Sequence, residues 1–521
     1  MKTDIKITAE LRKLLIEKDK EIVRLKQQVE WLTQQFRLMQ SRQFGSSSEK
    51  TGLVDNAEQI SLFNEAEVTV DPEALEPELE QISYARKKQK GKREADFSGL
   101  PTEQVIHELP ESECVCPDCG GEMHACGHEV FRRELTCVPA QYKVTEHVQT
   151  AYSCRHCERT SNHVPMKKSA VPVAMIPGSG MASPSLLAQI LNNKYTLALP
   201  LYRQEQEFRR IGVNLSRQTM SNWAIIAHER WFAELFKLLH AELLKNTILH
   251  ADETTLQVLR EEGRKATQKS YVWLYGTSGD TKRSVVLYDY QPSRAGECAS
   301  SFLDGFTGKL HTDGYDAYHC KLPPEITVIG CWAHMRRKFT DALKCLPPGI
   351  RNKSPAKTGL DYCTQLFGLE ADYTKQGLDF EDRYLTRIKK SKPIADAFFA
   401  WAKTEYDRNP TPKTTYGAAL TYAVNQKGWL MNVFLDGRLE LSNNRAERSV
   451  RPFAVGRKNW LFCNTPRGAD ASAAVYSIIE TAKANGLKPF EYLKFLLERL
   501  PYGTSAEDCL PWAETAQTIC K

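Results

Sequence analysis

Apolar residues recur every three or four positions through the first forty residues, which is the spacing of a heptad repeat. The two core positions of the repeat hold Leu15, Ile22, Val29 and Phe36, and Leu11, Leu25, Leu32 and Met39. β-Branched residues at the first of these positions with leucine at the second favour a parallel two-stranded coiled coil. The alternative is an amphipathic helix that packs on its own protein. We expect residues 1–48 to form a leucine-zipper coiled coil that makes a homodimer or a higher oligomer.

Beyond residue 246 the pattern changes to short apolar runs between polar turns, which predict strands. Three meandering strands come first. They begin with an apolar run over residues 247–252, residues 254–259 and 269–275 flank a polar turn as in a hairpin, and residues 284–290 form the third strand. A helix, a strand at 308–313, a short helix, a strand at 326–329 and a longer helix follow. This order is that of an RNase H-like sheet, in which the first and fourth strands are neighbours. We expect a multidomain α+β protein with this α/β core in residues 246–345 and 438–500, a helical insertion in 346–437 and a C-terminal tail in 501–521.

Residues 184–240, ahead of the sheet, have helical patterns only. A helix that starts at Pro200, a four-residue turn and a further helix capped by Ser216 fit a helix-turn-helix. The polar front of the last helix carries side chains that can read base edges, namely Arg217, Gln218, Ser221 and Asn222. A plain helical bundle with a polar face is the alternative.

The net charge of this 521-residue chain is only +6, so the distribution of charge is more informative than its sum. Residues 49–80 hold ten acidic residues and one lysine, whereas residues 86–93 hold six basic residues. Residues 49–100 are therefore expected to be a charged flexible linker. The basic run either contacts nucleic-acid phosphates or acts only as a solvated tether.

Composition excludes a collagen-like, a wholly disordered and a multi-span membrane protein. Hydrophobic residues make up 41% of the chain, and no apolar run approaches the length of a membrane span. The first residues lack the apolar core of a signal peptide. We expect a cytoplasmic, nucleoid-associated protein with no membrane partner.

Seven of the 15 cysteines fall between positions 114 and 157. Two C-x₂-C pairs stand out, Cys116 with Cys119 and Cys154 with Cys157, and such pairs can place four thiolates around one Zn²⁺. Residues 101–165 are therefore expected to be a zinc-binding module with a structural Zn²⁺. Redox or incidental cysteines are the alternative, and a ligand could be exchanged for a neighbour: Cys114, Cys126, Cys137 or His156.

Asp252 and Asp313 each follow an apolar strand pattern, and these two strands are the expected neighbours. Two carboxylates that close repel each other unless a cation lies between them, and Mg²⁺ or Mn²⁺ prefers such oxygen ligands. Strand alternation points Glu253 to the other face of the sheet. His334, one helical turn after Cys331, is expected to support this active site.

Glu447, in a helical pattern far downstream, is the best third carboxylate. Basic residues recur around it at every third position, which suits phosphate contact: Arg445, Arg448 and Arg451. The alternative is a solvated helix with a Glu447–Arg451 ion pair. Three carboxylates could hold two Mg²⁺ or Mn²⁺ ions, one activating a water or 3′-hydroxyl and one stabilising the leaving oxygen.

Several motifs resemble those of the transposases of the sixty-six family of bacterial insertion sequences, which are DDE enzymes. They are HADET at 250–254, TDGY at 312–315, CWAHMRR at 331–337, NNRAER at 443–448 and GRKNWLF at 456–462. The zipper with residues 42–50 and the cysteine pairs resemble the N-terminal leucine-zipper and zinc-binding domains of that family. The resemblance implies that Asp252, Asp313 and Glu447 are the catalytic, metal-binding acids.

The resemblance also implies a DNA transposase that binds the terminal inverted repeats of its element, cleaves strands and transfers them into target DNA. Small accessory proteins of the same element are further partners that it implies. Two alternatives stay open. One is a zinc and helix-turn-helix DNA-binding protein with an inert transposase core, and the other is a nuclease that cleaves without joining.

Overall fold

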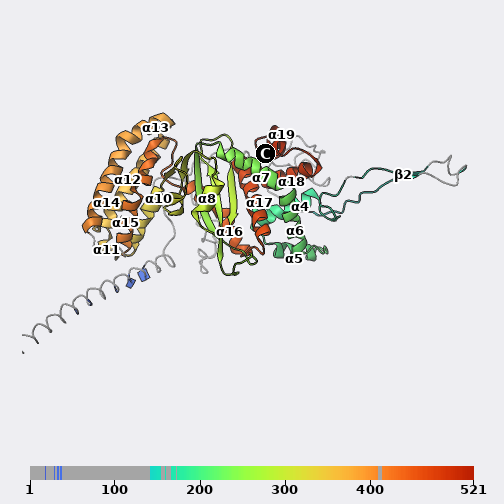
Figure 1. Cartoon of the computed structure of the whole chain (residues 1–521), viewed down its shortest axis with the longest axis horizontal. Helices are drawn as coiled ribbons and strands as arrows, with labels where there is room; N and C mark the ends of the chain where they lie inside the picture. The colour runs from blue at the N-terminus through green and yellow to red at the C-terminus, as the bar shows by residue number, and fades with distance from the viewer. Residues whose placement is uncertain are drawn as a thin grey trace, which may run out of the picture. The chain divides into compact units, whose positions relative to one another are not determined.

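Figure 1 shows the computed structural model, which describes residues 141–153, 159, 166–171, 173–408 and 414–521 and seven separate positions between 18 and 37. Those seven positions are helical, and the rest of the predicted coiled coil lies outside the described residues, as do the linker and the four predicted zinc ligands. The chain divides into two compact units, residues 1–56 with 172–521, and residues 57–171. In the second unit, β1 (Ala151–Ser153) and β2 (Met166–Lys168) pair as antiparallel strands.

A five-stranded sheet forms the centre of the first unit, in the order β5-β4-β3-β6-β7. Its strands are β3 (Ile248–Gln257), β4 (Lys269–Thr277), β5 (Val286–Gln291), β6 (Gly308–His311) and β7 (Ile326–Ile329). β4 runs antiparallel to both of its neighbours, β3 and β5, whereas β6 and β7 run parallel to β3. The prediction that the first and fourth strands are neighbours is confirmed.

The first strand joins two predicted stretches. β3 continues from the apolar run that ends at Asp252 through residues 254–257, and it pairs with β4 as the predicted hairpin of 254–259 with 269–275 requires. The parallel pairing with β6 is shorter and covers only residues 248–250 of β3 and 309–311 of β6. Asp252 therefore lies within β3, two residues beyond the parallel pairing, and Asp313 lies two residues beyond it in the other segment.

The β5 edge of the sheet is covered by a helix from late in the chain, α17 (Pro466–Ala484). The Ser477 hydroxyl accepts a hydrogen bond from the Tyr288 amide at 2.8 Å, and the Thr481 hydroxyl accepts one from the Val286 amide at 3.0 Å. These hydroxyls occupy backbone groups that another strand would otherwise reach. The closing elements are α18 (Pro489–Arg499), η6 (Leu500–Tyr502), η7 (Glu507–Cys509) and α19 (Glu514–Ile519).

A group of helices lies at the opposite edge, beyond β7 (Figure 1). Two short helices, α8 (Gly296–Phe302) and α9 (Ala317–Cys320), come before it in the chain. The group packs on α10 (Trp332–Lys344) and comprises α11 (Pro348–Arg351), α12 (Pro355–Lys375), α13 (Phe380–Thr386), η4 (Arg387–Ser391), α14 (Lys392–Arg408), α15 (Thr415–Met431) and η5 (Asn432–Leu435). Its core includes Trp332, Phe339 and Phe398. The Gly330 amide donates to the Trp429 carbonyl at 2.9 Å, which ties this insertion to the end of β7.

Between residues 184 and 244, ahead of the sheet, the chain forms five helical segments: α4 (Pro184–Tyr195), α5 (Leu201–Arg210), α6 (Arg217–Ala227), η3 (His228–Phe232) and α7 (Ala233–Leu244). The turn between α5 and α6 contains Gly212 at a φ of 82°, which favours glycine. Ser216 caps α6 as predicted, since its hydroxyl accepts a hydrogen bond from the Thr219 amide at 3.1 Å. No helix in the described ranges is long and apolar enough to cross a membrane.

Candidate active site

The three predicted acids come from three elements that meet at one end of the β3–β6 pairing. Asp252 lies within β3, and its Oδ1 accepts a hydrogen bond from the Glu253 amide at 2.8 Å. Asp313 follows β6, and its Oδ1 accepts one from the Tyr315 amide at 2.9 Å. Glu447 lies in the first turn of α16 (Asn444–Trp460), where its amide donates to the Asn443 carbonyl at 3.2 Å.

The other two carboxylates contribute to the electrostatics of Asp252. Burial raises the pKa of Asp252 first, and the charges of Glu253, Asp313 and Glu447 raise it further, to about 8. Charge interactions weaken with distance, so the side chains that act on Asp252 lie near it although Glu447 is far away in the sequence. A carboxyl group with this pKa is one that a cation would keep ionised at neutral pH.

The basic side chains that contact Glu447 come from α10. His334 Nε2 lies 3.7 Å from Oε1 of Glu447, and Arg337 Nη2 lies 3.6 Å from Oε2. Burial and the Arg337 charge lower the pKa of His334, while the charges of Glu447 and Asp313 oppose that shift. His334 therefore lies beside the acids, and the predicted alternative of a Glu447–Arg451 pair gives way to contacts across the fold.

Asn443 connects the elements that carry the acids, and no sequence pattern indicated this role. Its buried side chain donates to the Ala251 carbonyl at 2.8 Å and contacts Nδ1 of His250 at 2.9 Å. The backbone amide of Asn443 donates to Sγ of Cys331 at 3.2 Å. One residue thus fixes the start of α16 against β3 and against the start of α10.

Two buried histidines lie beneath the acids, each two residues before an aspartate. The rings of His250 and His311 stack with their centroids 5.1 Å apart, on residues that are register partners of β3 and β6. Burial and the neighbouring His250 lower the pKa of His311 to about 3, and burial lowers the pKa of His250 as well. Both rings are therefore neutral near pH 7 and add no charge to the site.

The carboxylate of Glu253 already has its partners. Arg294 Nε donates to Oε1 at 2.9 Å and the Tyr318 hydroxyl donates to Oε2 at 2.8 Å. The Arg294 guanidinium also lies 3.6 Å from the centre of the Tyr315 ring. Burial and then the charge of Asp313 raise the pKa of Glu253. Because both of its carboxylate oxygens already accept hydrogen bonds, Glu253 is a poorer candidate for a metal ligand.

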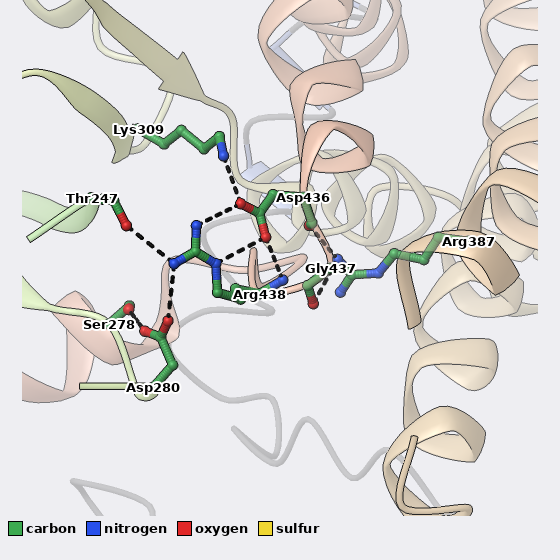
Figure 2. A network of polar contacts seen from close by, with 8 residues as sticks. All are labelled: Thr247, Ser278, Asp280, Lys309, Arg387, Asp436, Gly437 and Arg438. Carbon is green, nitrogen blue, oxygen red and sulfur yellow. Dashed lines mark hydrogen bonds and ion pairs between the residues drawn. The ribbon is translucent and has the colours of Figure 1, made fainter. Parts of the chain in front are cut away.

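A network of polar contacts, drawn in Figure 2, fixes the loop that leads from the insertion to α16. Asp436 Oδ2 accepts from Lys309 Nζ on β6 at 2.6 Å and from Arg438 Nη2 at 2.8 Å. Burial would raise the pKa of Asp436, but Arg438 and Lys309 outweigh it and hold the pKa well below its usual range. Arg387 of η4 donates to the Asp436 carbonyl at 3.2 Å, and Glu370 pairs with the same guanidinium at 2.6 Å.

The oxygen donors of the three acids suit a hard divalent cation in their chemistry, but their positions do not yet form a cation site. Asp252, Asp313 and Glu447 offer carboxylate oxygens, and Oε1 of Glu447 is buried without a hydrogen-bond partner. In the described ranges, however, no group of three or more His, Cys, Asp or Glu side chains is arranged to hold a metal ion as it stands. Like charges repel, so carboxylates alone favour an open arrangement.

The predicted DNA contacts differ in their availability. Arg217, Gln218 and Asn222 are exposed along the front of α6, and Ser221 is half-buried. On α16, Arg448 and Arg451 are exposed. Arg445 is not free in the same way, because its guanidinium pairs with Glu440 at 3.0 Å.

Comparison with known proteins decides what kind of site this is. The family model described as "Transposase IS66 family" matches residues 179–471, which include all three acids. The chain belongs to the IS66 transposase family. A zinc-finger model of IS66 transposases matches residues 113–158, an IS66 C-terminal element matches 477–512, and a leucine-zipper model described as "Transposase C of IS166 homeodomain" matches 31–105.

Full-length relatives resemble this IS66 transposase along most of its length. The uncharacterized protein y4qI of Sinorhizobium fredii is 31% identical over 92% of this chain and 88% of its own. The uncharacterized protein y4jD of the same organism is 30% identical over 81% of each chain. Among solved structures, the Drosophila P element transposase strand transfer complex matches with a TM-score of 0.31 and 10% identity, over 58% of this chain and 94% of its own. The protein is an insertion-sequence DNA transposase.

Proposed function

We propose that this transposase is a DDE enzyme in which Asp252, Asp313 and Glu447 hold two Mg²⁺ or Mn²⁺ ions within an RNase H-like core. The observation that carries the proposal is the register of β3 and β6. It sets Asp252 and Asp313 equal numbers of residues beyond the paired segment, and the charge of Glu447 reaches Asp252 from α16. When bound, such ions lower the pKa of an attacking water or 3′-hydroxyl and stabilise the leaving oxygen.

The other side chains of the site orient the acids and receive the DNA backbone. Asn443 fixes α16, and with it Glu447, against β3. His334 and Arg337 hold Glu447 from the side of α10. Arg448 and Arg451 face solvent on the same helix, where they can contact phosphates. Arg445, which pairs with Glu440, contributes by fixing the start of α16 more than by contacting DNA.

The remaining parts of the chain serve DNA binding and assembly in this proposal. The front of α6 reads the terminal inverted repeats through Arg217, Gln218, Ser221 and Asn222. Cys116, Cys119, Cys154 and Cys157 hold one structural Zn²⁺, and all four lie within the matched zinc-finger region. The N-terminal coiled coil makes a homodimer or a higher oligomer. Accessory proteins of the same element join the complex.

A strand-transfer assay tests the catalytic assignment. Purified protein is mixed with pre-cleaved element ends, supercoiled target plasmid and Mg²⁺ or Mn²⁺, and joined products are measured. We expect joining by the wild type and none by Asp252→Ala, Asp313→Ala or Glu447→Ala. Asp316→Ala is the matched control, because Asp316 is an exposed carboxylate three residues from Asp313 that makes no capping hydrogen bond.

The outcomes separate the proposal from its two alternatives. Joining that persists in Asp252→Ala would overturn the assignment of the acids. Metal-dependent nicking without joined products, lost in the same variants, would favour a nuclease. Specific binding of the ends without any strand chemistry would favour a DNA-binding protein with an inert core.

A further inference from the structure

Helix α16 ends in a strained turn that holds two apolar side chains in water. Leu461 has a φ of 67° and a ψ of −51°, and the Phe462 amide donates to the Trp460 carbonyl at 2.9 Å. This is a γ-turn of the rare, non-inverse form, which is strained for a residue with a side chain. Leu461 is 62% exposed and Phe462 is 44% exposed. We call these two residues the apolar tip.

Backbone hydrogen bonds hold the apolar tip from both sides. The Leu461 amide donates to the Arg457 carbonyl at 2.7 Å, which closes α16. The Cys463 amide donates to the Gln257 carbonyl at 2.9 Å, so the residue after the tip is bound to the end of β3. Strain of this kind persists only where the surrounding structure imposes it, and it gathers at functional sites.

A second strained turn lies against the first. Ala198 has a φ of 54°, and it and Leu461 are the two non-glycine residues with positive φ in the described part of the chain. Asn459 Nδ2 donates to the Ala198 carbonyl at 3.0 Å and so joins the two turns. Leu197, beside Ala198, is 64% exposed. The turn that leads into the predicted DNA-reading helices therefore adds another apolar side chain next to the tip.

Charge along α16 indicates what covers the apolar tip. Arg451 and Lys458 are exposed and share a side of the helix with Glu447, given the helical repeat of 3.6 residues. A polyanion that follows this side would meet Glu447 at one end of the helix and the tip at the other. Glu447 and Leu461 are separated by about 21 Å along the axis, the rise of about six base pairs of duplex DNA.

We propose that the apolar tip is a wedge that unstacks bases of the element's DNA about six base pairs from the bond that is cleaved at the acids. Leucine and phenylalanine are among the side chains that proteins insert between base steps to bend a duplex. A rigid, strained turn suits this task because its side chains need no ordering when they bind. The proposal rests on the proposed function, since the distance is counted from Glu447.

The test places 2-aminopurine, whose fluorescence rises when it is unstacked, in turn at each of the positions about four to eight base pairs from the cleaved bond. The protein is added in buffer without Mg²⁺ or Mn²⁺ and without a chelator, so that no strand is cut and the structural Zn²⁺ stays bound. We expect a rise at one or two adjacent positions with the wild type. We expect Leu461→Gly combined with Phe462→Ala to lose that rise. Glycine relieves the positive φ, so the fold is not threatened, and Ile519→Ala, another exposed apolar residue, should leave the rise unchanged.

Two further measurements keep the wedge separate from catalysis and from assembly. Asp252→Ala should retain the full fluorescence rise, because the wedge acts without the acids. An unchanged rise in the double variant, or no rise at any position with a wild type that binds the ends, would overturn the wedge. A double variant that keeps the rise but forms smaller oligomers in light scattering would instead assign the tip to a second copy of the chain. A wild type that does not bind the ends at all would overturn the proposed function itself.

Discussion

Replacing Asp252 with asparagine should stabilise the metal-free protein while abolishing strand cleavage. The pKa of Asp252 is raised to about 8 by burial and by three neighbouring carboxylates. The raised pKa means that the folded state favours the protonated form, so this group contributes stability below its ordinary pKa and loses it as pH rises toward 8. Asparagine stays neutral and can still accept the hydrogen bond from the Glu253 amide, so the variant avoids that loss.

The size of the effect follows from the shift. Between the ordinary pKa of an aspartate and pH 7, Asp252 ionises in the unfolded chain but stays protonated in the folded one. The free energy of unfolding therefore falls by about 1.4 kcal/mol per pH unit, or about 4 kcal/mol in total. The Asp252 side chain is half-buried, so solvent reaches it and screens its charge. We therefore discount the difference in the free energy of unfolding by about half, to roughly 2 kcal/mol. In a domain of this size that corresponds to a rise of about 3 °C in melting temperature.

Thermal unfolding in buffer without Mg²⁺, Mn²⁺ or a chelator measures the difference, at a pH below 4 and again near pH 7. The Asn variant should match the wild type at the lower pH and melt higher at the upper one. Saturating Mg²⁺ should narrow the gap, because it stabilises the wild type by binding. Asp316→Asn is the control and should show no gap, since Asp316 is exposed. A difference that does not change with pH, or a less stable variant at pH 7, would refute the reasoning.

Other substitutions probe the supports of the site. Asn443→Ala should lower the free energy of unfolding, measured in urea, by about 2 kcal/mol and should remove cleavage, since it leaves buried partners unpaired. The control Asn444→Ala changes an exposed neighbour and should do neither. Equal losses of stability and cleavage in both variants would show that Asn443 does not position the site. Arg387→Leu should lower the free energy of unfolding by about 3 kcal/mol, because it leaves Glu370 without its buried partner. Unchanged rates of amide hydrogen exchange in the insertion would contradict this. Ser216→Ala should cost about 1 kcal/mol and weaken binding of the ends, with unaltered affinity speaking against α6 as the DNA reader. Cys116→Ser should remove zinc from the purified chain, and full zinc content by atomic absorption would exclude it as a ligand.

The order of strands was predictable because each strand is a short apolar run between turn residues. The adjacency of Asp252 and Asp313 followed from that order. The hairpin of residues 254–259 with 269–275 was predicted, but not that it is continuous with the run 247–252 in one strand, β3, which pairs with β4 from Leu249 to Gln257. Tertiary pairing of this kind outweighs local pattern.

The supports of the site were hidden for a different reason. Asn443 stands in the polar motif NNRAER, yet it is buried and bonded to Ala251 and Cys331. Those partners are more than a hundred positions away, and no local periodicity records such contacts. The spacing of Glu447 and Arg451 likewise suggested an ion pair within the helix, but the charged partner of Glu447 is Arg337 on α10, with His334 beside it.

The position of the insertion between β7 and α16 has a consequence for the order in which the enzyme is synthesised. Asp313 and Glu447 are about 130 positions apart in the chain, which a ribosome covers in roughly 7 to 26 seconds. During that time the nascent chain already carries the helices that precede the sheet, but it lacks one acid and the helix that covers β5. A polypeptide released in this interval could occupy DNA without cutting it. Truncated products would then compete with the complete enzyme for the ends of the element and reduce how often it moves.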